Sequence, residues 1–245
     1  MKTFSQVVTA ALLLIAQSNS TGVVYTARFD KLGKKSAFNV WATDAKAKFL
    51  VTESDDPSMP MGISIIALDG GGRYDLIFPE KQAFVEMTRD QFRKLRQQQA
   101  EAHGVKIENS KLEELVVDGD GGLVAGNKTR YFKLKIAIDA IQNGQHIEFR
   151  VTEEFWTAPS IPNPAPSLDM LTQQVSGLDQ IDSLLDYKKL NGYPLKRVVQ
   201  LCENDQFIGT STVEITSIVN TSIAESLFTP PSDYKKIEVP ADRLQ

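Results

Sequence analysis

Apolar and polar side chains alternate with a period of two along most of this chain, which is the pattern of half-buried β-strands. Phe38 and Val40 occupy the apolar positions of the stretch AFNVWAT, and Phe49 and Val51 occupy those of KAKFLVTE. Strands are predicted in this part of the chain at residues 22–29, 37–43, 46–53, 63–68, 73–78 and 82–87. The turns between them are too short for crossover helices, so the pattern predicts an up-and-down antiparallel meander.

The second half of the chain repeats the alternation in longer strands. Phe132 and Leu134 belong to the apolar phase of residues 129–139, and Phe149 and Val151 belong to that of residues 146–156. The Asn143-Gly144 pair between these stretches favours a tight hairpin, because both residues tolerate a positive φ. Two further strands are predicted at residues 195–202 and 207–219.

Two segments have helical rather than strand patterns. Residues 88–103 begin with a capping box formed by Thr88 and Gln91, and Gly104 is a typical C-terminal stop. After a proline-rich connector, residues 168–185 carry apolar side chains at helical spacing: Leu168, Leu171, Val175, Leu178, Ile181 and Leu185. The sequence therefore predicts two helical insertions in a β protein.

These elements predict a mainly β fold of ten or eleven antiparallel strands with two helical insertions. A strongly twisted sheet of that size has to curl, so we expect an open or half β-barrel. Two helices cannot cover both faces of such a sheet, and we expect the concave face to cover them. An apolar cavity in the mouth of a barrel is a common ligand site.

The first twenty residues have the pattern of a secretory signal peptide. Lys2 supplies a positive charge, residues 7–16 are an apolar run interrupted only by Thr9, and small or polar residues follow. An N-terminal core helix is the alternative, because a run of this length is ambiguous. Cleavage after Ser18 or Ser20 would remove this segment and leave a periplasmic or secreted protein whose single domain covers residues 21–245. Because Cys202 is the only cysteine, an internal disulfide is excluded; we expect it to be a buried strand residue, and a reactive or intermolecular role is the alternative.

Composition narrows the function further. The formal net charge is -4, whereas a nucleic-acid-binding protein needs clustered excess positive charge. Apolar residues make up 42% of the chain, enough for a core without disulfides. No second apolar run reaches the ~20 residues of a transmembrane helix, so none is predicted in the mature chain.

Residues with catalytic or metal-binding chemistry are scarce. His103 and His146 have no second ligand at metal spacing, and the Asp118-Gly122 segment lacks the glutamate of a calcium loop. Glu153 and Glu154 are neighbours in a strand, so they point to opposite faces and make a poor acid–base pair. We predict neither an enzyme nor a bound cofactor.

Several segments together resemble a known superfamily. They are residues 74–82 (YDLIFPEKQ), 124–129 (VAGNKT), 152–156 (TEEFW), 192–196 (GYPLK) and 227–236 (LFTPPSDYKK). With the predicted leader, they are similar to the periplasmic lipoprotein carriers LolA and LolB, and most of all to a LolA-related bacterial family of unknown function. The resemblance implies an open barrel with helices filling an apolar cavity for acyl chains.

The chain also departs from that superfamily. LolA-type carriers usually have a helix before the first strand, whereas this chain enters its first predicted strand directly after the leader. These carriers have a functional arginine in a strand, and Arg28 is the only arginine early enough in this sequence to correspond to it.

Two functions from different classes follow. The first is a non-catalytic carrier or chaperone that binds a hydrophobic ligand, a lipid or a lipidated protein, in the half-barrel cavity. Its predicted lining residues, each of which could instead be ordinary core, are Phe38, Val40, Phe49, Val51, Phe132, Leu134, Phe149 and Val151. The second is an envelope interaction or sensor module. It would engage a protein partner through a sheet edge or through basic residues of the first helix, Arg89, Arg93, Lys94 and Arg96.

Overall fold

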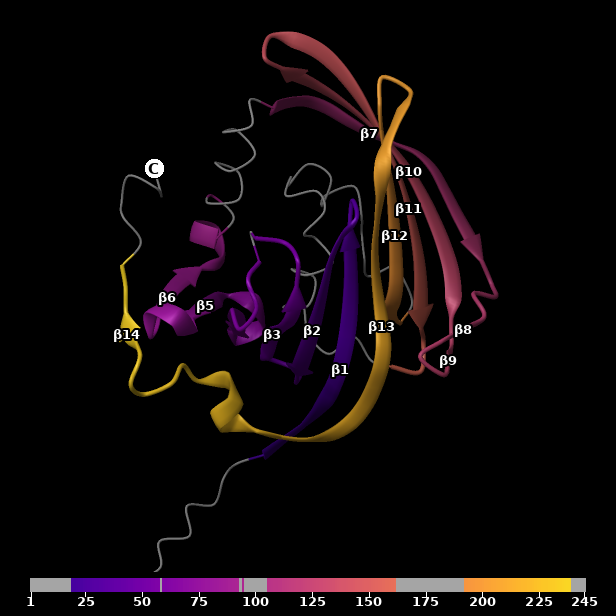
Figure 1. Ribbon diagram of the computed structural model, residues 1–245. Helices are drawn as coiled ribbons and strands as arrows, with labels where there is room; N and C mark the ends of the chain where they lie inside the picture. Colours follow the sequence, from indigo (N-terminus) through magenta and orange to yellow (C-terminus); the bar gives the residue numbers. More distant parts are fainter. Residues whose placement is uncertain (1–18, 58, 93, 95–104, 162–191, 239–245) are drawn as a thin grey trace, which may run out of the picture.

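The computed structural model of this chain describes residues 19–57, 59–92, 94, 105–161 and 192–238. Most of them belong to one curled, twelve-stranded sheet (Figure 1). Its first strands are β1 (Asn19–Lys31), β2 (Lys34–Ala42), β3 (Ala47–Ser54), β4 (Ser64–Leu68), β5 (Arg73–Phe78) and β6 (Ala83–Thr88). The others are β7 (Val105–Asp118), β10 (Arg130–Gln142), β11 (Gln145–Ala158), β12 (Tyr193–Glu203), β13 (Gln206–Ala224) and β14 (Lys235–Lys236).

Shorter elements connect these strands. A separate ribbon of two short strands joins β7 to β10, and 3₁₀ helices follow β4, β5 and β13. They are β8 (Leu123–Val124), β9 (Asn127–Lys128), η1 (Asp69–Gly71), η2 (Pro79–Lys81) and η6 (Glu225–Phe228). The predicted fold class, mainly β with a curled antiparallel sheet, is confirmed.

The sheet consists of two meanders joined along one seam. Its strand order is β14-β6-β5-β4-β3-β2-β1-β13-β12-β11-β10-β7, so within each half, apart from β14, neighbouring strands follow one another along the chain. The seam is the antiparallel pair of β1 and β13, which runs from Asn19 opposite Ala224 to Lys31 opposite Ser211. The chain therefore brings its first and last long strands together in the middle of the sheet.

Irregular pairing explains why the sheet curls. The register shifts in β1 between Thr26 and Ala27, in β2 between Ala37 and Phe38, and again in the pairings of β10, β11 and β12. A β-bulge adds an unpaired residue to one strand and increases the local bend and right-handed twist. The two meanders consequently turn toward each other, as the two sides of the ribbon in Figure 1 show.

The sheet has two faces of different character. We call the side that carries Tyr25, Val40 and Phe132 the inner face, and the opposite side the outer face. On the outer face of the first meander, η6 places Phe228 in a buried cluster with Ile66 and other residues of β4 and β5. The chain then continues to β14, which pairs in parallel with β6 (Figure 1).

The structure extends and corrects the predicted elements. Strand β7 and the short strands β8, β9 and β14 were not predicted. The pattern does not predict strand β7, because this edge strand is rich in charged residues, including Lys106, Lys111 and Glu113. Apolar and polar side chains therefore do not alternate regularly along it. The predicted boundaries of the other strands differ from those observed by three residues or fewer, except that β13 continues five residues beyond its predicted end.

The two predicted helices are described only in part. Residues 89–92 and 94 are helical, and the capping box is present: Thr88 N–H donates to Gln91 Oε1 at 2.8 Å and Gln91 N–H to Thr88 Oγ1 at 3.2 Å. The ring of Phe92 lies 5.2 Å from that of Tyr74, on the inner face as expected. The second predicted helix, residues 168–185, lies outside the described residues.

Candidate functional site

The eight predicted lining residues lie on the same face of the sheet. In the first meander Phe38 is opposite Val51 and Val40 opposite Phe49. Residues directly opposite each other in neighbouring strands share a face. Following the pairs from strand to strand across β1, β13 and β12 leads to Val151 and Phe149 in β11, and then to Leu134 and Phe132 in β10. Residues far apart in the sequence thus form one surface.

That inner face contains two apolar clusters. Phe38, Val40, Phe49 and Val51 belong to the larger one, whose members come from both meanders. The remaining predicted residues belong to the second cluster, formed by strands β7, β10, β11 and β12: Phe132, Leu134, Val151 and, half-buried at its margin, Phe149. All of the eight except Phe149 are buried. Whether any of them contacts a ligand stays a prediction.

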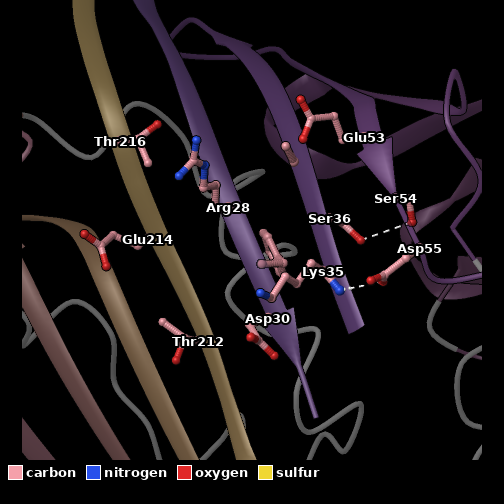
Figure 2. A pocket seen from close by; sticks show the side chains of 12 residues that line it. Arg28, Asp30, Lys35, Ser36, Glu53, Ser54, Asp55, Thr212, Glu214 and Thr216 are labelled. Atoms are coloured by element: carbon pink, nitrogen blue, oxygen red, sulfur yellow. Dashed lines mark hydrogen bonds between the residues drawn. The ribbon is translucent and has the colours of Figure 1, made fainter. Parts of the chain in front are cut away.

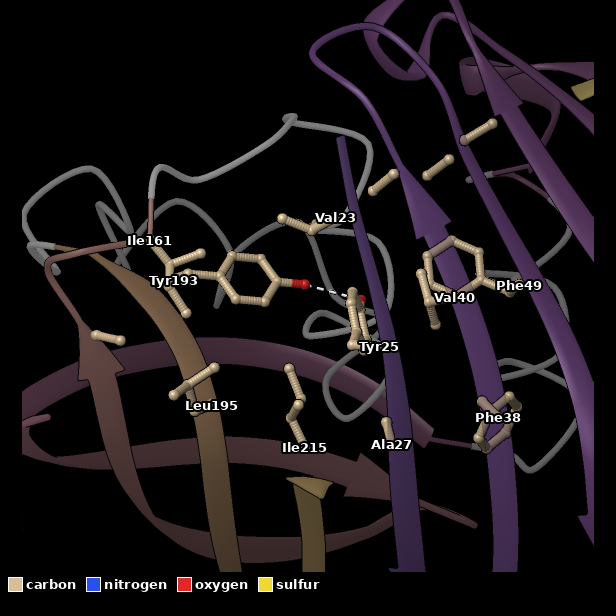
Figure 3. Packing of buried hydrophobic residues seen from close by; sticks show 14 of the residues in the cluster. Val23, Tyr25, Ala27, Phe38, Val40, Phe49, Ile161, Tyr193, Leu195 and Ile215 are labelled. Atoms are coloured by element: carbon tan, nitrogen blue, oxygen red, sulfur yellow. Dashed lines mark hydrogen bonds between the residues drawn. The ribbon is translucent and has the colours of Figure 1, made fainter. Parts of the chain in front are cut away.

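Two tyrosines connect the meanders across the seam. The Tyr193 hydroxyl of β12 donates a hydrogen bond of 2.7 Å to the Tyr25 hydroxyl of β1, although β13 lies between these strands. Their rings are 5.9 Å apart, and Figure 3 shows them pointing toward each other above Leu195 and Ile215. Burial raises the pKa of Tyr25 far above its ordinary value, while the hydrogen bond from Tyr193 lowers it by less. Tyr25 is therefore a neutral hydroxyl at physiological pH.

The second cluster encloses a pair of opposite charges. Arg197 Nη2 donates to Glu153 Oε1 at 2.7 Å, and the two side chains are 3% and 1% exposed. The guanidinium also lies over the Phe155 ring, with its carbon 5.3 Å from the ring centre. Three buried atoms of this pair have no hydrogen-bond partner: Glu153 Oε2, Arg197 Nε and Arg197 Nη1. A buried ion pair whose polar atoms lack hydrogen-bond partners is rare in protein cores.

The apolar inner face reaches the surface at the edge strand β7. Leu115 lies opposite Leu134 and is 49% exposed, and Val117 lies opposite Phe132 and is 55% exposed. Leu134 lies in turn opposite Glu153. Glu153 is therefore two strand spacings, roughly 10 Å, from an exposed apolar edge, and Arg197 in β12 is one strand further from it.

The outer face has a polar hollow of about 690 Å³ near the seam (Figure 2). Charged residues from β1, β2, β3 and β13 and the turn after β3 surround it: Arg28, Asp30, Lys35, Glu53, Asp55 and Glu214. Arg28 alternates with the inner-face residues Ala27 and Phe29, so its side chain is on the outer face. The arginine named in the family resemblance is thus separated from the apolar inner face by the sheet.

The alternative partner surface is only half described. Arg89 and Lys94 are exposed in the first helix, while Arg93 and Arg96 lie outside the described residues. A basic docking surface there stays a prediction.

Residues with metal-binding or catalytic chemistry are dispersed. The described part of the chain contains no cluster of three or more histidine, cysteine or acidic side chains that could hold a metal ion. His146 is exposed and 3.2 Å from Glu108, and His103 lies outside the described residues. In the predicted turn at residues 118–122, Asp120 Oδ1 accepts from Gly122 N–H at 2.9 Å. Cys202 is half-buried in β12, whereas we expected it to be buried.

The sequence pattern singled out Glu153 but did not predict that it forms a buried ion pair. Glu153 and Glu154 do point to opposite faces: Glu153 is buried with Arg197, and Glu154 accepts a hydrogen bond from the Tyr131 hydroxyl. The overlooked signal was Arg197, which occupies an apolar-phase position of its strand between Leu195 and Val199. Opposite charges at apolar-phase positions of two strands predict a buried pair only once those strands are known to be neighbours.

Known proteins are similar to this chain only at low sequence identity and low structural overlap. No protein-family model matches this chain, and no curated protein matches its sequence. Among solved structures, an uncharacterized conserved protein from Thermus thermophilus is 10% identical with a TM-score of 0.44, covering 90% of this chain and 91% of its own. The MucA/MucB complex of Pseudomonas aeruginosa gives 11% identity and a TM-score of 0.43 over 91% of this chain.

A structure of MucB alone is similar at 12% identity and a TM-score of 0.42, over 89% of this chain. This chain spans 59% of the length of the MucB chains in both structures. Within the described residues, no helix is both long and apolar enough to cross a membrane.

Proposed function

We propose that this protein is exported and binds a hydrophobic ligand, a lipid or the lipid moiety of a protein, on the inner face of its open sheet. In this proposal it is a non-catalytic carrier or chaperone. The observation that carries it is the common face of the eight lining residues, which come from β2, β3, β10 and β11. The apolar surface comes from both halves of the chain, and the proposal places a long apolar ligand along it.

The energetics suit such a ligand. Each buried methylene group contributes about 0.8 kcal/mol, so a long acyl chain gains affinity without any polar motif. Displaced core contacts and the ordering of the ligand offset part of this gain. The exposed apolar edge formed by Leu115 and Val117 provides a place where a ligand first touches the inner face.

The test compares two neighbouring valines that point to opposite faces. Val117 lies opposite Phe132 on the inner face, and Val116 lies opposite Lys133 on the outer face. Both side chains are exposed, so an aspartate at either position leaves the fold intact. Val117→Asp should weaken binding of the apolar dye N-phenyl-naphthylamine about tenfold, the loss expected for one apolar contact, and Val116→Asp should leave it unchanged. Fluorescence titration measures both affinities.

Native mass spectrometry of gently purified protein supplies the second measurement. The proposal expects a co-purifying lipid in the wild type and less of it in Val117→Asp. Protein that carries no lipid and shows no saturable dye uptake would contradict ligand binding on the inner face.

A protein partner at the β7 edge is the second candidate function. Among the described residues, strand β7 is the last strand of the sheet, and Leu115, Val116 and Val117 are all exposed there, on both faces. A free strand edge with apolar side chains can pair with a strand of another protein. In this case Val116→Asp and Val117→Asp would weaken the complex with the partner protein equally. A pull-down with each variant, followed by size-exclusion chromatography of the recovered complex, would show this.

A further inference from the structure

The buried pair of Glu153 and Arg197 presents an unusual set of unused hydrogen-bonding atoms. Glu153 Oε2 can accept one hydrogen bond, whereas Arg197 Nε and Nη1 can each donate. Leaving such atoms unpaired in a buried environment is costly, so native proteins normally satisfy them with protein atoms or water. The pair can therefore form further hydrogen bonds with a group that has both a donor and an acceptor.

The neighbours of the pair are apolar. Glu153 lies between Leu134 and Val199 in the adjacent strands, and Arg197 lies between Phe155 and Val213. An aliphatic chain seated on this surface would place only its polar end near the pair. The exposed Leu115 of the edge strand β7 lies two strand spacings from Glu153 on the same face.

The charges decide which polar end fits. A carboxylate or phosphate has only acceptors, so it can satisfy Arg197 but is repelled by the unpaired oxygen of Glu153. An amide has an N–H for Glu153 Oε2 and a carbonyl oxygen for an Arg197 nitrogen. It is also neutral, so it adds no third charge to a buried pair that is already balanced.

We propose that Glu153 and Arg197 form a polar subsite that recognises the amide group of a long-chain amide and discriminates against a fatty acid anion. This inference rests on the proposed binding of apolar ligands at the inner face and specifies the chemical class of the ligand.

The experiment uses palmitamide and palmitate as competitors for the bound dye on the full mature chain. Palmitamide should displace the dye at a concentration about tenfold lower than palmitate does, the ratio expected from one hydrogen bond to a charged group. Glu153→Gln removes the repelling charge and leaves Arg197 unbalanced, so palmitate should then bind at least as well as palmitamide.

Two further variants separate a subsite from a structural pair. Glu114 and Lys135 form an ion pair of 2.6 Å on the outer face of β7 and β10, so Glu114→Gln is the matched control and should keep the wild-type ratio. The double variant Glu153→Leu with Arg197→Met replaces both charges with apolar side chains, which buried pairs often tolerate. It should bind the dye and lose the preference for palmitamide.

The outcomes are distinguishable. Dye binding with equal affinity for palmitamide and palmitate in the wild type would overturn the amide subsite and leave the proposed function standing, with water as the partner of the unused atoms. A ratio unchanged in the double variant would overturn it as well. Absence of dye binding would overturn the proposed function and the subsite together.

Discussion

At the scale of residues, the ionisable side chains within the sheet have distinct environments. Arg197 and Glu153 balance each other on the inner face, whereas Asp75 of β5 is 3% exposed on the outer face and its Oδ1 has no hydrogen-bond partner. Burial raises the pKa of Asp75, nearby Arg73 lowers it by less, and Glu86 opposite it raises it further. Asp75 thus costs stability when ionised.

This environment predicts a pH-dependent effect of Asp75→Asn. Because the pKa of Asp75 in the folded protein lies above its ordinary value of 3.8, the folded state holds the proton more tightly than the unfolded state does. The wild type therefore loses stability as pH rises from about 4 through the folded pKa. The asparagine variant lacks this loss.

Urea unfolding at acidic and neutral pH measures the effect. The stability of Asp75→Asn relative to wild type, measured as the difference in the free energy of unfolding, should be greater at pH 7 than at pH 4. Asp233→Asn, at an exposed carboxylate, is the control and should change stability by about 0.5 kcal/mol or less at both values. A difference for Asp75→Asn that is independent of pH would contradict the assignment.

At the scale of elements, strand β1 connects the predicted leader to the fold. It begins at Asn19, opposite Ala224, and the Ser20 hydroxyl donates a hydrogen bond of 2.5 Å to Glu225 Oε1. Lys46 also contacts Glu225, and these two contacts lower the pKa of that carboxyl. Cleavage after Ser18 would keep all of β1, whereas cleavage after Ser20 would remove its first two residues.

We therefore predict that the exported protein begins at Asn19. The reason is that cleavage at this point leaves the first pairs of the seam and the Ser20–Glu225 hydrogen bond in place. Edman sequencing of protein recovered from the periplasm or the medium identifies the first residue. A mature N-terminus at Thr21 would refute this choice of site, and an uncleaved chain in the cytoplasm would refute export.

At the scale of the whole molecule, the β1–β13 seam makes the two meanders one structure. The larger apolar cluster contains Tyr25 and Phe38 of one meander together with Tyr193 and Leu195 of the other. A meander without the other would lose the packing contacts of this cluster and the backbone pairing between β1 and β13. We therefore expect the sheet to fold as a single domain.

The chain supplies a probe for each meander, because its two tryptophans are Trp41 in β2 and Trp156 in β11. In the single-tryptophan variants Trp156→Phe and Trp41→Phe, fluorescence reports unfolding of the first and second meander respectively. For each variant, the urea transition seen by fluorescence should coincide with that seen by circular dichroism, as in two-state unfolding. A meander that unfolds separately would give a fluorescence transition displaced from the circular dichroism transition, and the molecule would then contain two domains.

Much of this architecture could be read from local patterns. Alternation placed Phe38, Val40 and Phe132 in strands with the correct phase, and Asn143-Gly144 lies at the hairpin between β10 and β11. Strand β7 could not be found in this way, because the charges that keep an edge strand soluble also remove its alternation. The partner of Glu153 was equally hidden, since Arg197 is 44 residues away in sequence.

The sequence by itself determined the class of the fold and which face of each strand is apolar, because the direction of a side chain follows from the two-residue period of a strand. Only the tertiary structure decided the strand order, the seam between the first and last long strands, and the pairing of Arg197 with Glu153. Those features depend on contacts between distant segments, whose free energy comes from packing and is not encoded in any local pattern.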